Sequence, residues 1–178
     1  MNRPVTRRDI LKTAAAAGSS LAFPASLRSE TGEGEDRFKI GACDWSIGRR
    51  GRPDALELAK RIGLDGVQVT FGRPGDEHDL RKGEVRREYL RAVETHGVQI
   101  ASLAMGMLNQ VPYSSDPDAE QWVRECVEVM PKLGQKVALL AFFSKGDIKG
   151  KPDLQDAVIR RLKRVAPEIG RASCRERV

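Results

Sequence analysis

The chain has 178 residues, of which 40% are hydrophobic and 31% are charged, and these values are typical of a soluble globular protein with one real core. The formal net charge of +6 is concentrated at the two ends, because residues 1–27 carry four basic side chains and one acidic one, and residues 169–178 carry three arginines and one glutamate. Residues 28–168 are left with a net charge of +1, which gives no electrostatic case for binding nucleic acid.

The N-terminus has the features of an export signal. Residues 6–12 contain Arg7 and Arg8 in a segment that resembles the twin-arginine motif, and an alanine-rich, weakly apolar run follows up to Ala25. A basic segment before a short apolar run is typical of a secretion signal and not of a spanning helix. We therefore expect residues 1–27 to be a twin-arginine signal peptide, the alternative being an ordinary amphipathic helix. The resemblance implies the twin-arginine translocase as a partner, a periplasmic or otherwise extracytoplasmic location in a bacterium, and no stable membrane span after cleavage.

Two further segments are expected to lie outside the folded domain. Residues 28–37 are polar and rich in Gly and Glu, which predicts a flexible linker. Residues 169–178 match, codon for codon, one reading frame of a common sequencing adapter, so we expect this tail to be an assembly artefact without helical or strand periodicity. On this interpretation the natural sequence ends at Glu168, inside a helix, and resequencing the locus would test it.

Strands and helices are predicted to alternate along residues 38–168. The expected strands are 38–43, 67–71, 98–104 and 137–143, and the expected helices are 53–62, 84–95, 117–133 and 153–165. Gly97 and Gly134 are placed to end two of the helices, Asp116 is placed to cap the N-terminus of the third, and Pro131 predicts a kink in its last turn. The strands are near-continuous apolar runs, so the pattern predicts an α/β fold with parallel strands.

The loops of this pattern are asymmetric. Connections from helix to strand are short, whereas those from strand to helix are long. In a (β/α)₈ barrel the functional face is built from the loops that follow the strands, and an open Rossmann-type sheet also binds ligands there. Residues 43–48 lack the glycine-rich fingerprint that a Rossmann sheet needs, and no P-loop is present.

Three segments resemble a known family. Residues 63–69 (GLDGVQV) resemble the G-(F/L)-D-G-V-E junction of the xylose-isomerase-like TIM-barrel proteins, the sugar phosphate isomerase/epimerase group. Residues 40–46 (IGACDWS) resemble the first strand of that family, and residues 96–102 (HGVQIAS) resemble the entry to its third strand. The resemblance spans residues 38–168 and implies an α/β (β/α)₈ TIM barrel, of which only the first four β/α units, a half barrel, are present.

The resemblance also implies a chemistry. Family members isomerise or epimerise ketoses and related polyols, with a metal polarising oxygens while a carboxylate moves a proton next to the carbonyl. We expect a divalent metal (Mn, Mg or Zn) in the full-length protein, with all ligands beyond Glu168, so no metal ligand and no catalytic residue is assigned in this chain. We expect the fragment itself to be inactive. The alternative is a non-catalytic carbohydrate-binding barrel, and the near-neutral charge argues against the endonuclease branch.

Four residues are candidates for substrate binding, each with a structural alternative. Trp45 could stack on a sugar ring, or it could pack in the core or within the loop. Gln68 stands where many relatives have glutamate, and it could contact substrate or be a satisfied polar residue inside the barrel. His78, in the loop after the second strand, could contact a ligand or be solvated, and Asn109, in the third loop, could donate to a hydroxyl.

Other features allow two interpretations each. The basic run 49–52 could meet a phosphate or be a solvated loop. Cys43 and Cys126 could form a disulfide in an exported protein, although burial as small hydrophobic residues is favoured. A half barrel would leave its first and fourth strands as open edges, so we expect residues 28–168 alone to be insoluble or to dimerise.

Overall fold

A computed structural model describes residues 38–174, and the side chains of residues 38–169. The described residues all belong to one compact unit of the chain that begins at Phe38. The predicted signal peptide, with Arg7 and Arg8, and the predicted linker 28–37 lie outside the described residues.

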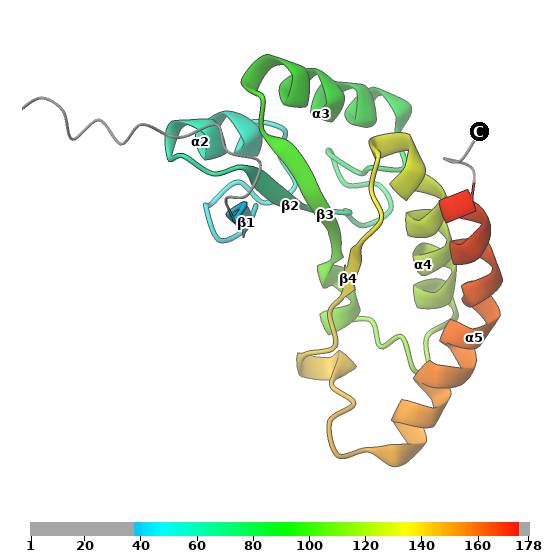
Figure 1. Cartoon of the computed structure of the whole chain (residues 1–178). Coiled ribbons are helices and arrows are strands. Elements are labelled where there is room, and N and C mark those ends of the chain that lie inside the picture. The colour runs from blue at the N-terminus through cyan, green and yellow to red at the C-terminus, as the bar shows by residue number, and fades with distance from the viewer. Residues whose placement is uncertain (1–37, 175–178) are drawn as a thin grey trace, which may run out of the picture. The chain divides into compact units, whose positions relative to one another are not determined.

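Four parallel strands form a single sheet in the order β1-β2-β3-β4 (Figure 1). They are β1 (Gly41–Cys43), β2 (Gly66–Thr70), β3 (Gln99–Met105) and β4 (Ala138–Leu140). Each strand pairs in parallel with the next one along the chain. Since a parallel neighbour requires a crossover, this order confirms the predicted α/β alternation and leaves β1 and β4 as the two edges of the described sheet.

The helices confirm most of the predicted boundaries. They are α2 (Ala55–Arg61), α3 (Gly83–His96), α4 (Pro117–Val129) and α5 (Pro152–Cys174), with 3₁₀ turns η1 (Gly106–Asn109), η2 (Met130–Leu133) and η3 (Ser144–Gly146). Gly97 and Gly134 end α3 and η2 in the left-handed conformation, at φ values of 67° and 65°. The Asp116 carboxylate accepts a hydrogen bond from the Asp118 amide at 2.9 Å, as an N-cap does. The last turn of the predicted third helix tightens to 3₁₀ geometry around Pro131, which has no amide hydrogen to donate.

The edge strands are shorter than predicted. The ladder of β1 begins at Gly41 instead of Phe38, and that of β4 ends at Leu140 instead of Phe143. An edge strand has a neighbour on only one side, so pairing stops where that neighbour turns away. The chain before β1 is nevertheless tied down, because the Ile40 amide donates to the Asp65 carboxylate at 2.8 Å and the Ile40 carbonyl accepts from the Asp65 amide at 2.8 Å.

The fourth helix is longer than predicted. It was expected over 153–165, yet α5 continues through Pro167 to Cys174, so the expectation that residues 169–178 lack helical structure is wrong for 169–174. Contacts with α4 hold this helix, since Glu120 accepts from Arg164 at 2.6 Å and Arg124 pairs with Glu168. These contacts hold α5 to α4 on both sides of Pro167, which has no amide hydrogen for a helical hydrogen bond.

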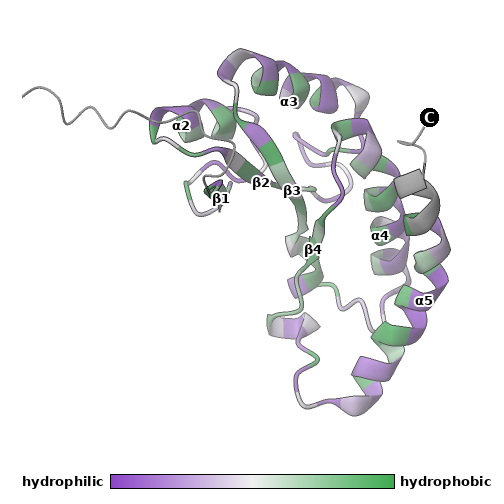
Figure 2. Ribbon diagram, in the orientation of Figure 1, coloured by the Kyte–Doolittle hydropathy of each residue, from purple (hydrophilic) through white to green (hydrophobic). Residues whose placement is uncertain are grey.

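The core lies between the sheet and the helices. Val67, Val69 and Leu103 point to the helical side and are fully buried, whereas the alternating residues Gln68 and Thr70 face the other side and are only half-buried. This alternation gives the sheet one face covered by helices and one face that in a closed barrel would line the interior. Figure 2 shows β3 and β4 as mostly apolar.

Large apolar side chains remain exposed near the two edge strands. They are Phe38 (94% exposed), Ile40 (61%), Val137 (60%), Leu139 (40%) and Phe143 (66%). Exposed apolar groups beside open strand edges are a recognised cause of association. No helix among residues 38–174 is both long enough and apolar enough to cross a membrane.

Candidate functional site

A buried carboxylate organises the loop that follows β1. Asp44 is fully buried, and its Oδ2 accepts hydrogen bonds from the amides of Gly51, at 2.8 Å, and Thr70, at 2.7 Å. Its Oδ1 accepts a third hydrogen bond, of 2.8 Å, from the Thr70 hydroxyl. Three donors compensate a charge that would otherwise be costly to bury. Asp44 thereby ties the loop after β1 to the end of β2.

The loop after β2 is fixed by a second polar cluster. Asp79 is almost fully buried, and its Oδ1 accepts from the Arg81 amide at 3.0 Å and from the Arg81 guanidinium at 2.9 Å. The same guanidinium bonds Glu125 of α4 at 2.5 Å and lies 4.3 Å above the Phe71 ring. The loops after β1 and β2 are therefore each held by an internal charge, which favours a preformed binding site.

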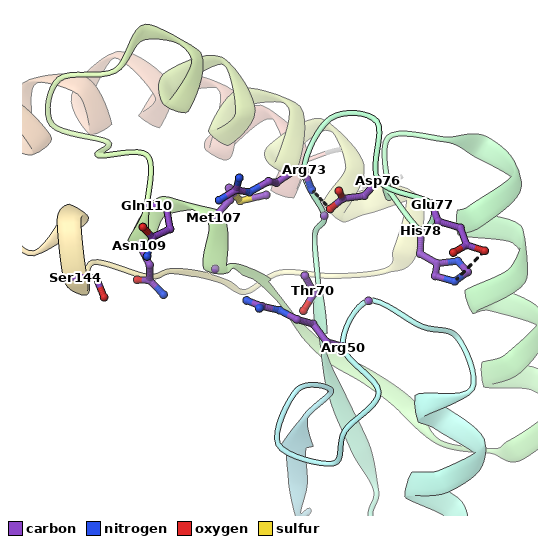
Figure 3. Close-up of a pocket in the computed structure, with 13 residues that line it drawn as sticks. Arg50, Thr70, Arg73, Asp76, Glu77, His78, Met107, Asn109, Gln110 and Ser144 are labelled. Atoms are coloured by element: carbon purple, nitrogen blue, oxygen red, sulfur yellow. Dashed lines mark hydrogen bonds and ion pairs between the residues drawn. The ribbon is translucent and has the colours of Figure 1, made fainter.

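A cavity of about 610 Å³ opens at the carboxyl ends of the strands (Figure 3). All four loops that follow the strands contribute to its wall. The lining residues are Arg50, Gly51, Thr70, Gly72, Arg73, Asp76, Glu77, His78, Gly106, Met107, Asn109, Gln110 and Ser144. This position is the one at which parallel α/β folds bind their ligands, and it confirms that the long loops gather at one end of the sheet.

A second, more apolar cavity of about 320 Å³ adjoins the first. Its lining residues are Trp45, Arg50, Ala104, Gly106, Asn109, Leu139, Ala141 and Phe143. Arg50, Gly106 and Asn109 line both cavities, so these three residues form the boundary between a polar and an apolar compartment. Such a pairing suits a ligand with one charged end and one less polar end.

The structure brings three of the four predicted binding residues to these cavities. Trp45 lines the apolar cavity and is 38% exposed, so it is not a core residue. His78 lies in the polar cavity, with its Nε2 3.9 Å from the Glu77 carboxylate. Asn109 lies between the cavities, and its Oδ1 accepts from the Phe143 amide at 2.9 Å, which leaves its amide nitrogen available.

Gln68 lies deeper, away from both cavity linings. Its Nε2 donates to the Ser102 hydroxyl at 2.8 Å, and its Oε1 accepts from the Cys43 thiol at 3.2 Å. A register shift after Val67 places Gln68 opposite Ser102 on the neighbouring strand. The three polar side chains therefore satisfy one another on the interior face of the sheet.

Cys43 and Cys126 are free thiols. Cys126 is buried, and burial raises its pKa to about 12. Burial also raises the pKa of Cys43. Neither residue has the lowered pKa of a nucleophilic cysteine, so the interpretation as small hydrophobic residues fits better than a disulfide.

The described part of the chain does not form a metal centre by itself. Within residues 38–174 no group of three or more His, Cys, Asp and Glu side chains is arranged to hold a metal ion. The acids on the polar cavity, Asp76 and Glu77, are already in contact with the Arg73 amide and with His78. These residues therefore do not fit the ligand set that a divalent sugar-isomerase metal would need.

The sequence did not predict the role of Asp44, nor that the arginines of the basic run 49–52 have different partners. Arg49 and Arg52 pair with Asp54, at 3.4 and 2.8 Å, whereas Arg50 alone lines the cavities. Spacing along the chain gives no signal for this division, because it depends on how the loop folds around Asp44.

Comparisons with known proteins show which proteins the chain resembles. No protein-family model matches the chain. A curated relative, the 2-epi-5-epi-valiolone 7-phosphate 2-epimerase of an Actinoplanes species, is 31% identical over 112 residues, which are 62% of this chain and 41% of that protein. A solved structure of a xylose isomerase-like TIM barrel protein from Mycobacterium smegmatis, in complex with magnesium, matches with a TM-score of 0.55 and 14% identity over 76% of this chain and 53% of its own.

The chain thus spans about two fifths of the curated relative and about half of the solved structure. Both matches support the resemblance to the xylose-isomerase-like barrels. The described residues have an α/β fold, built of four parallel β/α units, that matches part of a xylose isomerase-like TIM barrel.

Proposed function

We propose that this chain belongs to a sugar phosphate isomerase/epimerase-like protein that moves a proton at a carbon next to a carbonyl. The observation that carries the proposal is the pair of adjoining cavities at the carboxyl ends of the strands, in a fold shared with a xylose isomerase-like barrel. The relationship to an epimerase of a cyclitol phosphate supports the same class of reaction.

In this proposal the described residues bind and orient the substrate. Trp45 offers a flat apolar surface for a sugar ring, and the free amide nitrogen of Asn109 can donate to a hydroxyl. His78 stands at the polar end of the site as a further ligand contact. Gln68 has no ionisable group and its polar atoms are already engaged, so we assign no general base to it.

We propose that the proton-transferring groups and the metal site belong to a part of the protein outside residues 38–168. A divalent metal (Mn, Mg or Zn), when bound, would polarise the carbonyl and hydroxyl oxygens of the substrate. The magnesium in the structural neighbour supports this choice of ion. The present chain alone is expected to bind substrate without converting it.

Export is part of the proposal. The twin arginines Arg7 and Arg8 and the apolar run after them support passage through the twin-arginine translocase to an extracytoplasmic site. A fusion of residues 1–37 to a reporter that is active only outside the cytoplasm tests this. Replacement of both arginines by lysine should abolish the reporter signal, and an unchanged signal would contradict a twin-arginine route.

One observation favours a second function. Gln68 stands where many relatives have glutamate, and the polar groups of its side chain are engaged by Ser102 and Cys43. These features would also suit a non-catalytic barrel that only binds carbohydrate. Incubation of the protein encoded by the complete locus with Mg²⁺ or Mn²⁺ and a panel of ketoses and sugar phosphates separates the two. Formation of an isomer or epimer supports the enzyme, and tight binding without conversion supports the binding protein.

A further inference from the structure

We propose that Arg50 is the anchor for an anionic group of the ligand, a phosphomonoester on a small sugar, at the boundary between the two cavities. This inference rests on the proposed function for the sugar, but the anion site is argued from this chain alone. Arg50 is exposed, and it lines both the polar and the apolar cavity.

The first argument is that Arg50 is uncompensated. Its neighbours Arg49 and Arg52 both pair with the Asp54 carboxylate. Among residues 38–174, the Arg50 guanidinium has neither an ion pair nor a hydrogen bond, whereas the acids of the polar cavity are engaged elsewhere. Figure 3 shows Glu77 and His78 at one end of the cavity and Arg50 away from them, on the side of Thr70 and Asn109.

The second argument is that the backbone on both sides of Arg50 is fixed. The Arg49 amide donates to the Asp44 carbonyl at 2.8 Å, and the Gly51 amide donates to the Asp44 carboxylate at 2.8 Å. Gly51 adopts a φ of 65°, which a residue with a side chain rarely does. The hydrogen bonds thus hold the backbone from which Arg50 projects, so less backbone freedom is lost when a ligand binds there.

The third argument is that the cavity wall at Gly106 leaves space for the Arg50 guanidinium. A Cβ on Gly106, at the end of β3, would lie 3.1 Å from Nη2 of Arg50. Asn109, Gln110 and Ser144 supply neutral hydrogen-bonding groups to the wall of the same cavity. Arg73 also lines it, and among the described residues the Arg73 guanidinium has no ion-pair partner (Figure 3). A planar fork of donors beside neutral donors is the arrangement that binds a phosphate monoester.

The position also orients the ligand. With its phosphate at Arg50, a sugar ring would extend over the apolar cavity, where Trp45, Leu139 and Phe143 form the wall. Neutral sugars would lack the anchor and bind more weakly.

The test is a titration of the chain at low concentration, followed by tryptophan fluorescence. The chain has two tryptophans, and Trp122 is part of the packing around the core, so a W122F background lets the emission report Trp45 alone. The probes are inorganic phosphate, a hexose 6-phosphate and the parent hexose. We expect both phosphates to bind, and the hexose 6-phosphate to bind more tightly than the hexose.

Arg50→Gln should weaken phosphate binding by about tenfold or more, equivalent to about 1.4 kcal/mol. Arg50→Lys should restore part of it, because the charge returns without the fork. Arg52→Gln is the matched control, since it removes the same charge from the same loop but faces Asp54, and it should leave binding within about twofold of wild type. Circular dichroism checks that each variant is folded.

Three results would overturn the inference: no phosphate binding by the wild-type chain, equal losses in the Arg50 and Arg52 variants, or equal affinity for hexose and hexose 6-phosphate. None of them would by itself defeat the proposed function, because proton transfer next to the carbonyl does not require that Arg50 hold the phosphate. Conversely, phosphate binding by this chain combined with no conversion by the complete protein would defeat the proposed function and keep the anion site.

Discussion

Asp44 should be the most stability-critical polar residue at the functional end of the sheet. Its carboxylate accepts three hydrogen bonds, two from backbone amides and one from the Thr70 hydroxyl. Hydrogen bonds to charged groups contribute about 1.5–3 kcal/mol each, and a buried donor left without a partner costs about 1–3 kcal/mol. Asp44→Ala removes all three bonds and leaves the Gly51 and Thr70 amides without their acceptor.

The full sum is not expected, because Gly51 and Thr70 are only half-buried and water can reach part of the gap. We therefore predict a loss of about 3–5 kcal/mol in the free energy of unfolding for Asp44→Ala. Asp44→Asn should cost less, about 1–2 kcal/mol, because its oxygen can accept from both amides while its NH₂ donates to the Thr70 hydroxyl.

The assay is urea unfolding in a background that carries Leu139→Lys and Phe143→Ser, which remove exposed apolar groups near β4 and favour the monomer, and it is followed by tryptophan fluorescence and far-UV circular dichroism. Asp76→Ala is the control, because Asp76 is exposed and, within residues 38–174, its carboxylate accepts one hydrogen bond, from the Arg73 amide at 2.7 Å. It should change the free energy of unfolding by about 0.5 kcal/mol or less. A loss below about 1 kcal/mol for Asp44→Ala, or an equal loss for Asp76→Ala, would refute the reasoning.

Three further predictions concern the helices, a thiol and the open edges. The hydrogen bond from Arg164 lowers the pKa of Glu120 from 4.5 to about 2, so the stability that ionised Glu120 contributes should be present above pH 4.5 and be lost as the pH falls toward 2. Glu120→Gln should abolish that part of the pH dependence of urea unfolding. An unaltered profile would show that the ion pair contributes nothing. Burial raises the pKa of Cys126 to about 12, so in a C43S/C174S background, where Cys126 is the remaining thiol, the native chain should resist alkylation at mildly alkaline pH; rapid labelling without urea would contradict the buried position. Residues 28–168 should precipitate or sediment as dimers, and Phe143→Ser together with Leu139→Lys should raise the monomer fraction; a monodisperse, cooperatively melting wild-type monomer would contradict the open-edge argument.

Local signals predicted the fold well. Gly97, Gly134 and Asp116 end or cap elements as expected, because a left-handed turn and an N-cap depend on one or two residues and their immediate neighbours. The alternation of apolar strands with amphipathic helices was equally visible, since one face of each element must be buried. The lengths of the edge strands were not predicted, because pairing with a single neighbouring strand decides them. The extent of α5 was not predicted either, because ion pairs with α4 decide it.

The sequence predicted the location of the candidate site but not the contacts within it. Long loops after the strands located the cavities, and Trp45, His78 and Asn109 reached their walls. The sequence did not single out Arg50 within the basic run 49–52. That distinction depends on how the loop folds around Asp44, through contacts such as the hydrogen bond from the Gly51 amide. Gln68 was ambiguous from sequence for a similar reason, since its partners Cys43 and Ser102 lie on two other strands.

The exchange of carbon-bound hydrogen tests the central claim most directly. The protein encoded by the complete locus, supplied with Mg²⁺ or Mn²⁺, is incubated with sugar phosphates in deuterated water, and the substrates are followed by nuclear magnetic resonance and mass spectrometry. We predict that one substrate gains a single deuterium at the carbon next to its carbonyl, in step with formation of its epimer or isomer. Substrates that bind but gain no deuterium and yield no isomer would contradict the claim.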